Sequence, residues 1–221
     1  MRKPEDKLGM FIPGDLIDGH HHQTTQLVSG NPVTQKRIAR ACFDSVFADL
    51  KPDAIFIIRG TEVHVGGSAC NEEEIADDWK REGLPVQTDE HTASWWHFVG
   101  DFEGVRVDVA HHGRMGGRSW TKPNQALMHA ADIYMKHSRR KLRHPDLVLR
   151  AHSHTSADSH DAHPVRYIAM PAWMFKSSHA HKVVPNEFPD IGGVIATCEN
   201  GELDAKLIVY PLDPPKVWTA A

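Results

Sequence analysis

The sequence predicts an α/β fold in which helices cover a mixed β-sheet. Short apolar runs of strand length alternate with helical patterns along much of the chain. Two stretches, 95–109 and 191–211, instead show two strands separated by a short turn, which favours antiparallel pairs. This order of elements is typical of an α/β sandwich with a mixed sheet. With 221 residues, the chain can bury a sizeable core and is predicted to form one domain over 1–221.

Composition narrows the class of protein. The formal net charge of −4 indicates no global attraction to nucleic acid, which stays open as a partner without being indicated. No apolar run approaches the roughly 20 residues that cross a bilayer, so no membrane partner is expected. Three cysteines lie far apart without a CxxC spacing, which favours a reduced, cytoplasmic setting. The 17 histidines favour a metalloenzyme, because imidazole is the commonest metal-ligand side chain.

Two helices are predicted in the first half of the chain. The first covers 31–50, with Asn31 as its N-cap and Lys51-Pro52 as its stop. Its core-facing side is predicted to carry the apolar residues that recur at every fourth position: Ile38, Cys42, Val46 and Leu50. The second covers 71–83, and acidic residues in its first turn complement the helix dipole.

Strands are predicted where short apolar runs are bounded by turn residues. The run 147–149 is too short and too uniformly apolar for an amphipathic helix, so it is predicted to be a buried strand. The other predicted strands lie at 11–12, 53–58, 95–99, 105–109, 165–170, 191–197 and 203–211. Asn200-Gly201 is a strong hairpin signal between the last two. A third helix is predicted to begin at Pro123 and to end in the basic stretch 136–144.

Polar side chains follow four of the predicted strands. The candidate site residues are Asp15, Asp18, Thr61, Glu62, His64, His111, His112, His152 and His154. In an extended chain His152 and His154 would point to the same side, and they could bind one metal or one each of two adjacent metals. Each segment taken alone could equally be an ordinary polar turn or loop.

A glycine-rich loop over 114–119 carries two arginines, Arg114 and Arg118. Guanidinium groups and exposed backbone N–H groups would suit this loop to hold a phosphate oxygen. Glycine- and arginine-rich loops are also frequent on protein surfaces. The loop therefore supports a phosphate-binding function only together with the other segments.

Taken in order, the four polar segments resemble the motifs of the calcineurin-like metallophosphoesterases. That family's pattern runs Asp-x-His, Gly-Asp-x-x-Asp, Gly-Asn-His-Asp/Glu, a lone His and Gly-His-x-His. The matching segments are Gly14-Asp15-x-x-Asp18, Gly60-Thr61-Glu62, His111 and His152-x-His154. The stretch 14–19 with its trailing histidines looks like the phage-encoded branch. The resemblance implies a metallophosphoesterase-like αββα sandwich with mixed sheets, two divalent metal ions (Mn, Fe or Zn), and a phosphate ester as substrate.

The resemblance also implies a role for each metal-binding candidate. Asp15 would bridge both metals, His111 and His152 would bind the second metal, and His154 would bind the first. His112 would replace His111 if the register slips by one residue. The activity implied is hydrolysis of a phosphomonoester or phosphodiester by a metal-bridging hydroxide.

The third motif departs from the family pattern. Thr61 stands where the family has a metal-binding Asn, and Glu62 stands where it has the His that assists the leaving group. Either Glu62 or the nearby His64 would therefore protonate the leaving oxygen. Arg114 or Arg118 would neutralise the charge that develops on the phosphate.

The first motif of the family is missing. No Asp-x-His precedes Asp15, so the first metal would lack two ligands. We expect that the chain is an N-terminally shortened form of a longer protein, without its first βα unit. The competing explanation is that some of His20 to His22 rebuild the first site. Three stretches match Asp-x-His without following an apolar strand: Asp89–His91, Asp158–His160 and Asp161–His163. The alternative function is a degenerate or truncated, non-catalytic relative that binds a metal or a partner.

Overall fold

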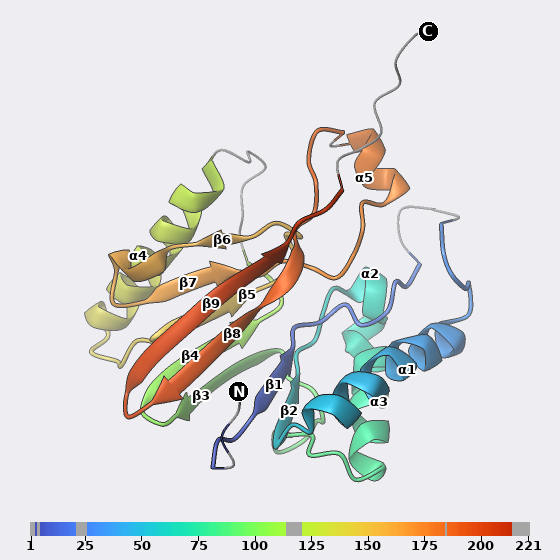
Figure 1. The fold of residues 1–221 in the computed structure, drawn as a ribbon, viewed down its shortest axis with the longest axis horizontal. Coiled ribbons are helices and arrows are strands. Elements are labelled where there is room, and N and C mark those ends of the chain that lie inside the picture. Colours follow the sequence, from blue (N-terminus) through green and yellow to red (C-terminus); the bar gives the residue numbers. More distant parts are fainter. Residues whose placement is uncertain (1–2, 4, 21–25, 114–120, 184, 214–221) are drawn as a thin grey trace, which may run out of the picture.

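The structure is a computed structural model that describes residues 3, 5–20, 26–113, 121–183 and 185–213. Helices lie at its two outer sides, and strands lie between them (Figure 1). The predicted α/β class is confirmed, and the largest sheet is mixed as expected. No helix within the described ranges is long and apolar enough to cross a membrane.

One β layer is a pair of parallel strands. β1 (Gly9–Ile12) pairs with β2 (Ala54–Ile57), and Ile12 lies opposite Ile57. The predicted first helix, α1 (Pro32–Leu50), lies between these strands in the chain and allows the parallel pairing, which needs a crossover connection. α3 (Cys70–Arg81) follows β2 and confirms the second predicted helix. Because the strands are parallel, the segments that follow them leave the layer at the same edge.

The second β layer is a five-stranded sheet in the order β3-β4-β5-β7-β6. Its strands are β3 (His97–Phe102), β4 (Val105–Ala110), β5 (Leu147–Arg150), β6 (Ala157–Asp158) and β7 (Arg166–Ala169). β4, β5 and β7 are parallel, whereas the two edge strands are antiparallel to their neighbours. α4 (Lys122–Arg139) provides the crossover from β4 to β5, so the segments after these strands also share one edge.

The predicted C-terminal hairpin is confirmed. β8 (Ile191–Glu199) pairs in antiparallel fashion with β9 (Glu202–Tyr210). The two turn residues have φ of 52° at Asn200 and 86° at Gly201. Asn and Gly tolerate this left-handed conformation, which matches the twist of the two strands.

Alternating side chains of β2 and of Ile58, the residue that follows it, face two different cores. Ile55 and Ile57 pack against α1 and α3, whereas Phe56 and Ile58 pack toward the five-stranded sheet and the hairpin. On the other face of that sheet, Val148 packs against α4. Successive strand residues point to opposite faces, so each layer contributes to two cores. The layers therefore follow the order helix, sheet, sheet, helix.

The core-facing side predicted for α1 is wrong. Ile38 is 39% exposed and Leu50 is 50% exposed, while the side that faces the core carries Gln35, Ala39 and Phe47. Phe47 packs edge-on against Trp79 of α3, with ring centroids 5.0 Å apart. The true face is rotated by about one residue, roughly 100° around the helix. Periodicity could not separate two adjacent apolar stripes, and the aromatic contact with α3 decides between them.

The third predicted helix is confirmed, but it ends earlier than predicted. α4 stops at Arg139, and Lys141 has a left-handed φ of 54°, so the basic stretch up to His144 is mostly loop. Four short helical segments complete the described structure: α2 (Glu62–Val65), η1 (Gly67–Ala69), η3 (His160–Ala162) and α5 (Ser178–Val183).

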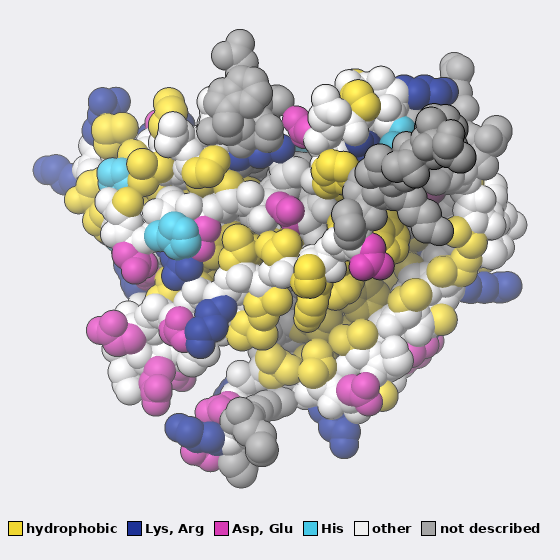
Figure 2. Space-filling model, turned by 45° about the horizontal axis from the view of Figure 1, so that its top comes forward, with side chains coloured by type: hydrophobic (Ala, Val, Ile, Leu, Met, Phe, Trp, Pro, Cys, Tyr) yellow, Lys and Arg dark blue, Asp and Glu magenta, His cyan; other side chains and the backbone are white. Residues whose placement is uncertain are grey.

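Large hydrophobic side chains also lie on the surface. Trp173 and Phe175, between β7 and α5, are 77% and 76% exposed. On the face seen in Figure 2, hydrophobic side chains gather across the middle, and most charged groups lie nearer the rim. Apolar character alone therefore does not identify the core of this protein.

Candidate metal centre

Segments that follow four strands meet at one place. Asp15 follows β1, Thr61 follows β2, His111 follows β4 and His152 follows β5. The Thr61 hydroxyl oxygen lies 3.2 Å from His111 Nε2 and 3.1 Å from His152 Nδ1. Asp15 Oδ2 lies 3.0 Å from His111 Nε2. The parallel strands of the two layers thus bring these four predicted residues together.

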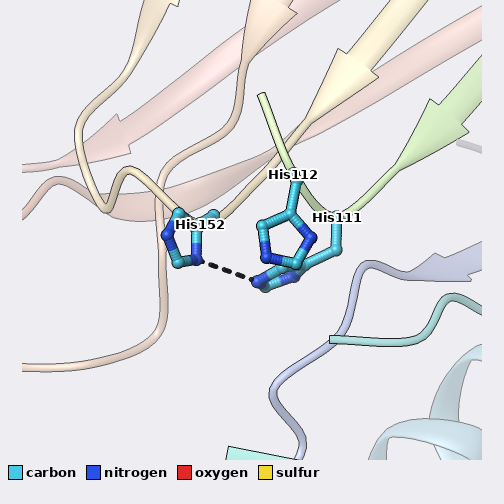
Figure 3. A group of neighbouring side chains, drawn as sticks. All are labelled: His111, His112 and His152. Carbon is cyan, nitrogen blue, oxygen red and sulfur yellow. Dashed lines mark hydrogen bonds between the residues drawn. The ribbon is translucent and has the colours of Figure 1, made fainter. Parts of the chain in front are cut away.

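Three imidazole rings form the centre of this site. His111, His112 and His152 each turn a ring nitrogen toward the others, and these atoms all lie within 4.8 Å of one another (Figure 3). His111 Nε2 and His152 Nδ1 are 3.3 Å apart. Within the described part of the chain, this is the one group of three or more His, Cys, Asp or Glu side chains with such spacing. The residue expected only as a fallback, His112, therefore belongs to the group.

His111 is held in one orientation by the backbone. Its ring is 3% exposed, and Nδ1 donates to the Pro13 carbonyl oxygen at 2.6 Å. A carbonyl oxygen only accepts hydrogen bonds, so Nδ1 carries the hydrogen and Nε2 faces the other two rings. A histidine whose second nitrogen is tied in this way is typical of a metal ligand.

The donor set fits a divalent cation. The Thr61 hydroxyl lies 3.1–3.4 Å from a ring nitrogen of each of the three histidines, yet it has a single hydrogen to donate. The hydroxyl can therefore satisfy the lone pair of only one of these three ring nitrogens. A cation would satisfy all of them, and imidazole nitrogen together with carboxylate oxygen suits Zn, Mn or Fe.

Close backbone approach places Asp15 at the centre. Asp15 has a left-handed φ of 58°, and its Oδ1 accepts a hydrogen bond from Thr61 N at 2.6 Å. A Cβ atom at Gly14 would lie 2.6 Å from His111 Nδ1, and one at Gly60 would overlap the Asp15 carboxylate. Glycine is therefore required at both positions for the two loops to approach each other and His111.

Burial and neighbouring charges set the protonation states of the site. Burial is the largest single influence and would raise the pKa of Asp15, but the hydrogen bond and charge of His111, together with the Thr61 N–H, lower the Asp15 pKa on balance. Burial opposes the charge on His111, yet the hydrogen bond and charge of Asp15, together with the Pro13 carbonyl, raise the His111 pKa on balance. Burial first, and then the charge of His111, lower the pKa of both His112 and His152. These last two rings therefore favour the neutral form, whose lone pair can bind a metal.

The extended conformation expected for the His-x-His segment is wrong. β5 ends at Arg150, and His152 and His154 have left-handed φ values of 68° and 53°. His152 joins the three-histidine group, but His154 does not. The backbone carbonyl of His154 accepts a hydrogen bond from Asp190 N at 2.9 Å, and burial is the main cause that lowers the His154 pKa.

The two candidate proton donors have different surroundings. His64 is partly buried, and its Nδ1 donates to the Asp18 carbonyl oxygen at 2.7 Å. Glu62 is exposed, and its carboxylate accepts from Ser68 N at 3.4 Å. Electrostatics also place His64 near the site, because its charge adds to the effect of burial on the His154 pKa. Arg114 and Arg118 lie outside the described residues.

Two of the Asp-x-His letter matches have structural roles instead. Asp89 accepts hydrogen bonds from the backbone N–H groups of His91 and Thr92, as in an Asx turn. Asp158 forms an ion pair with Arg166 at 2.8 Å. In the His20–His22 stretch, His20 is exposed and its Nε2 lies 2.7 Å from the Gly30 carbonyl oxygen, and the other two histidines fall outside the described residues.

One residue near the site was not predicted from the sequence. Glu72, in the first turn of α3, is fully buried, and it accepts hydrogen bonds from Leu16 N at 3.1 Å and Gly60 N at 2.6 Å. Burial raises its pKa to about 7, although the two backbone N–H groups act in the opposite direction. The sequence offers no signal for this role, because three consecutive glutamates occupy that turn and all of them suit the helix dipole.

Comparisons with known proteins give only distant likenesses. No protein-family model matches the sequence, and no curated protein matches it. Vps29 from Entamoeba histolytica, complexed with zinc, aligns over 91% of this chain and 98% of its own at 9% identity, with a TM-score of 0.46. Vps29 from Cryptosporidium parvum aligns over 92% and 97% at 11% identity, with a TM-score of 0.41. The Thermotoga maritima protein TM1076 aligns over 93% and 100% at 15% identity, with a TM-score of 0.39. These TM-scores are too low to carry an argument about family or function.

Proposed function

We propose that the chain is a metal-dependent phosphoesterase of the calcineurin-like type, which hydrolyses a phosphomonoester or a phosphodiester. One observation carries this proposal: Asp15, Thr61, His111 and His152 come from four strand ends and meet within hydrogen-bonding distance. The convergence follows the order of the motifs that the sequence shares with that family. Membership of the phage-encoded branch, and a phosphate ester as the substrate, are predictions from the sequence resemblance.

The residues divide into two sets that would hold cations. His111, His112 and His152 would bind one ion, with Asp15 beside them. A second ion would need Asp15 as a bridge and His154, which lies outside the three-histidine group, as a ligand. Bound divalent cations would lower the pKa of a water molecule and neutralise phosphoryl oxygens.

His64 is the better candidate for the proton donor. Its Nδ1 is tied to the Asp18 carbonyl, so Nε2 is the nitrogen that would exchange a proton with the leaving oxygen. Glu62 is exposed, and its carboxylate accepts from Ser68 N instead. Arg114 stays a predicted phosphate-binding residue together with Arg118.

Cleavage of a chromogenic phosphodiester tests the proposal. We expect hydrolysis that requires added Mn²⁺ or Zn²⁺ and that is abolished by Asp15→Ala and by His152→Ala. His160→Ala is the matched control, because His160 is an exposed histidine from one of the Asp-x-His letter matches. Metal-dependent cleavage that survives either of the first two substitutions would contradict the assignment.

A non-catalytic metal-binding protein is the second candidate function. Thr61 replaces the amide ligand of the family pattern, and within the described residues only one group of three candidate ligands forms. This function predicts that the folded protein binds one ion per chain and cleaves neither phosphomonoesters nor phosphodiesters. Metal-stimulated turnover would exclude it.

A further inference from the structure

The buried carboxylate of Glu72 joins the two loops that carry the oxygen ligands. Leu16 directly follows Asp15, and Gly60 directly precedes Thr61. One oxygen of Glu72 accepts from Leu16 N, and the other accepts from Gly60 N. A single buried side chain thus fixes both loops at once.

These bonds continue the pairing of β1 and β2 beyond the end of the strands. Among the described residues, the last backbone hydrogen bond between the two segments runs from Ile58 N to Ile12 O at 2.9 Å. Beyond it, Asp15 is in the left-handed region and the two loops are joined by side chains: Asp15 accepts from Thr61 N, and Glu72 accepts from its two amides. A fully buried carboxylate is costly, so its two backbone partners are what make this position tolerable.

We propose that Glu72 is a positioning residue that holds Asp15 and Thr61 in the geometry required to bind a metal with the histidine group. The inference rests on the proposed metal-dependent function. Glu72 would contact no reacting atom and would act through its hydrogen bonds to the Leu16 and Gly60 amides. Loss of its acceptors should therefore loosen both loops and weaken metal binding while the fold persists.

The neighbouring residue Glu73 provides a matched control. Its carboxylate accepts from Ala93 N at 2.7 Å and from Ser94 N at 3.0 Å, and it pairs with Arg59. Glu73 thus fixes a loop through the same kind of bonds and from the same turn of α3, but neither of its backbone partners adjoins a proposed ligand. If Glu72 only stabilised the fold, substitutions of Glu72 and Glu73 would lower metal affinity equally.

The experiment compares Glu72→Gln, Glu72→Met and Glu73→Gln in the full chain. Gln keeps one acceptor oxygen, whereas Met fills a similar volume and keeps none. Two quantities are measured: amide hydrogen exchange at Leu16 and Gly60, and affinity for Zn²⁺ by calorimetry. We expect faster exchange at one or both amides in Glu72→Gln and at both in Glu72→Met. We expect Zn²⁺ affinity to fall by about 10–100-fold in these two variants, the range typical of lost hydrogen bonds behind metal ligands.

The outcomes separate the two claims. Unchanged exchange at Leu16 and Gly60 in both Glu72 variants overturns the positioning role, whatever the metal result. Equal losses of affinity in Glu73→Gln also overturn it, because the effect would then be general destabilisation. A wild-type protein that binds no Zn²⁺ overturns the proposed function, while the exchange data still decide whether Glu72 holds the loops.

Discussion

The two sides of the candidate metal centre are held in place differently. On the imidazole side, His111 and His152 follow neighbouring parallel strands whose last paired residues are Ala110 and Arg150. The ladder even continues by one bond, from Ala151 N to His111 O at 2.9 Å. On the oxygen side, Asp15 and Thr61 lie beyond the last bond between β1 and β2, and the buried Glu72 holds their loops. Sheet register thus fixes the imidazoles, whereas one side chain fixes the oxygens.

This difference predicts that the imidazole side dominates metal affinity. His152→Ala removes a proposed ligand from the side that the sheet holds, so we expect Zn²⁺ affinity to fall by more than the roughly 10–100-fold typical of losing a supporting hydrogen bond. The ring is exposed, so the unfolding free energy should change little. Calorimetric titration of the variant beside His160→Ala measures the effect. Equal Zn²⁺ affinity in the two variants would show that His152 is not a metal ligand.

The oxygen side is predicted to contribute less to affinity. Thr61→Val removes the hydroxyl but keeps the side-chain shape and the backbone N–H that donates to Asp15. We expect an affinity loss of about tenfold. The hydroxyl would mainly orient the imidazole rings through hydrogen bonds, while the ring nitrogens would supply most of the binding. The same titration tests this value. A loss as large as that of His152→Ala would make the two sides equivalent and break the comparison.

The pH dependence of stability should report the Glu72 carboxylate. Burial raises its pKa from 4.5 to about 7, so the folded protein holds a proton there that the unfolded chain has already released. Wild-type protein should therefore lose stability relative to Glu72→Gln as the pH rises from 4.5 to 7, and gain it back on acidification. The expected amplitude is on the order of 3 kcal/mol. Urea unfolding of the metal-free proteins at several pH values measures it, and parallel curves for the two proteins would contradict the account.

The smallest effect is expected at Glu62. Its side chain is exposed and accepts one long hydrogen bond, so Glu62→Gln should change the unfolding free energy by less than about 0.5 kcal/mol and leave metal affinity unchanged. His64→Gln should also preserve metal affinity but lower kcat for the phosphodiester. Steady-state kinetics compare the two variants. A larger fall in kcat for Glu62→Gln than for His64→Gln would identify Glu62, and not His64, as the proton donor.

Much of the candidate site could be predicted from strand ends. Side chains that follow parallel strands reach the same edge of a sheet, which groups Asp15 with Thr61 and His111 with His152. The motif resemblance joins the two pairs into one site. The conformation of the final segment could not be predicted, because His152 and His154 adopt left-handed backbone angles that a strand pattern does not contain. Those angles separate the two rings that an extended chain would place together.

The parts that could not be predicted depend on tertiary contacts. The face of α1 that packs inward is decided by the contact between Phe47 and Trp79, which lie 32 positions apart and whose rings meet at 5.0 Å. Glu72 has the same local sequence context as its two glutamate neighbours, and only the approach of Leu16 and Gly60 distinguishes it. Local patterns predict elements and their ends, whereas the partners of each side chain arise from the packing of distant segments.

Metal content per chain tests the central claim most directly. Tag-free protein would be dialysed against trace Mn²⁺ and Zn²⁺, and bound metal would be counted by elemental analysis in wild type and in His152→Ala. The account predicts at least one ion per wild-type chain, two if His154 and Asp15 complete the second site, and loss of the ion in the variant. Wild-type protein without bound metal, or equal metal content in the two proteins, would contradict it.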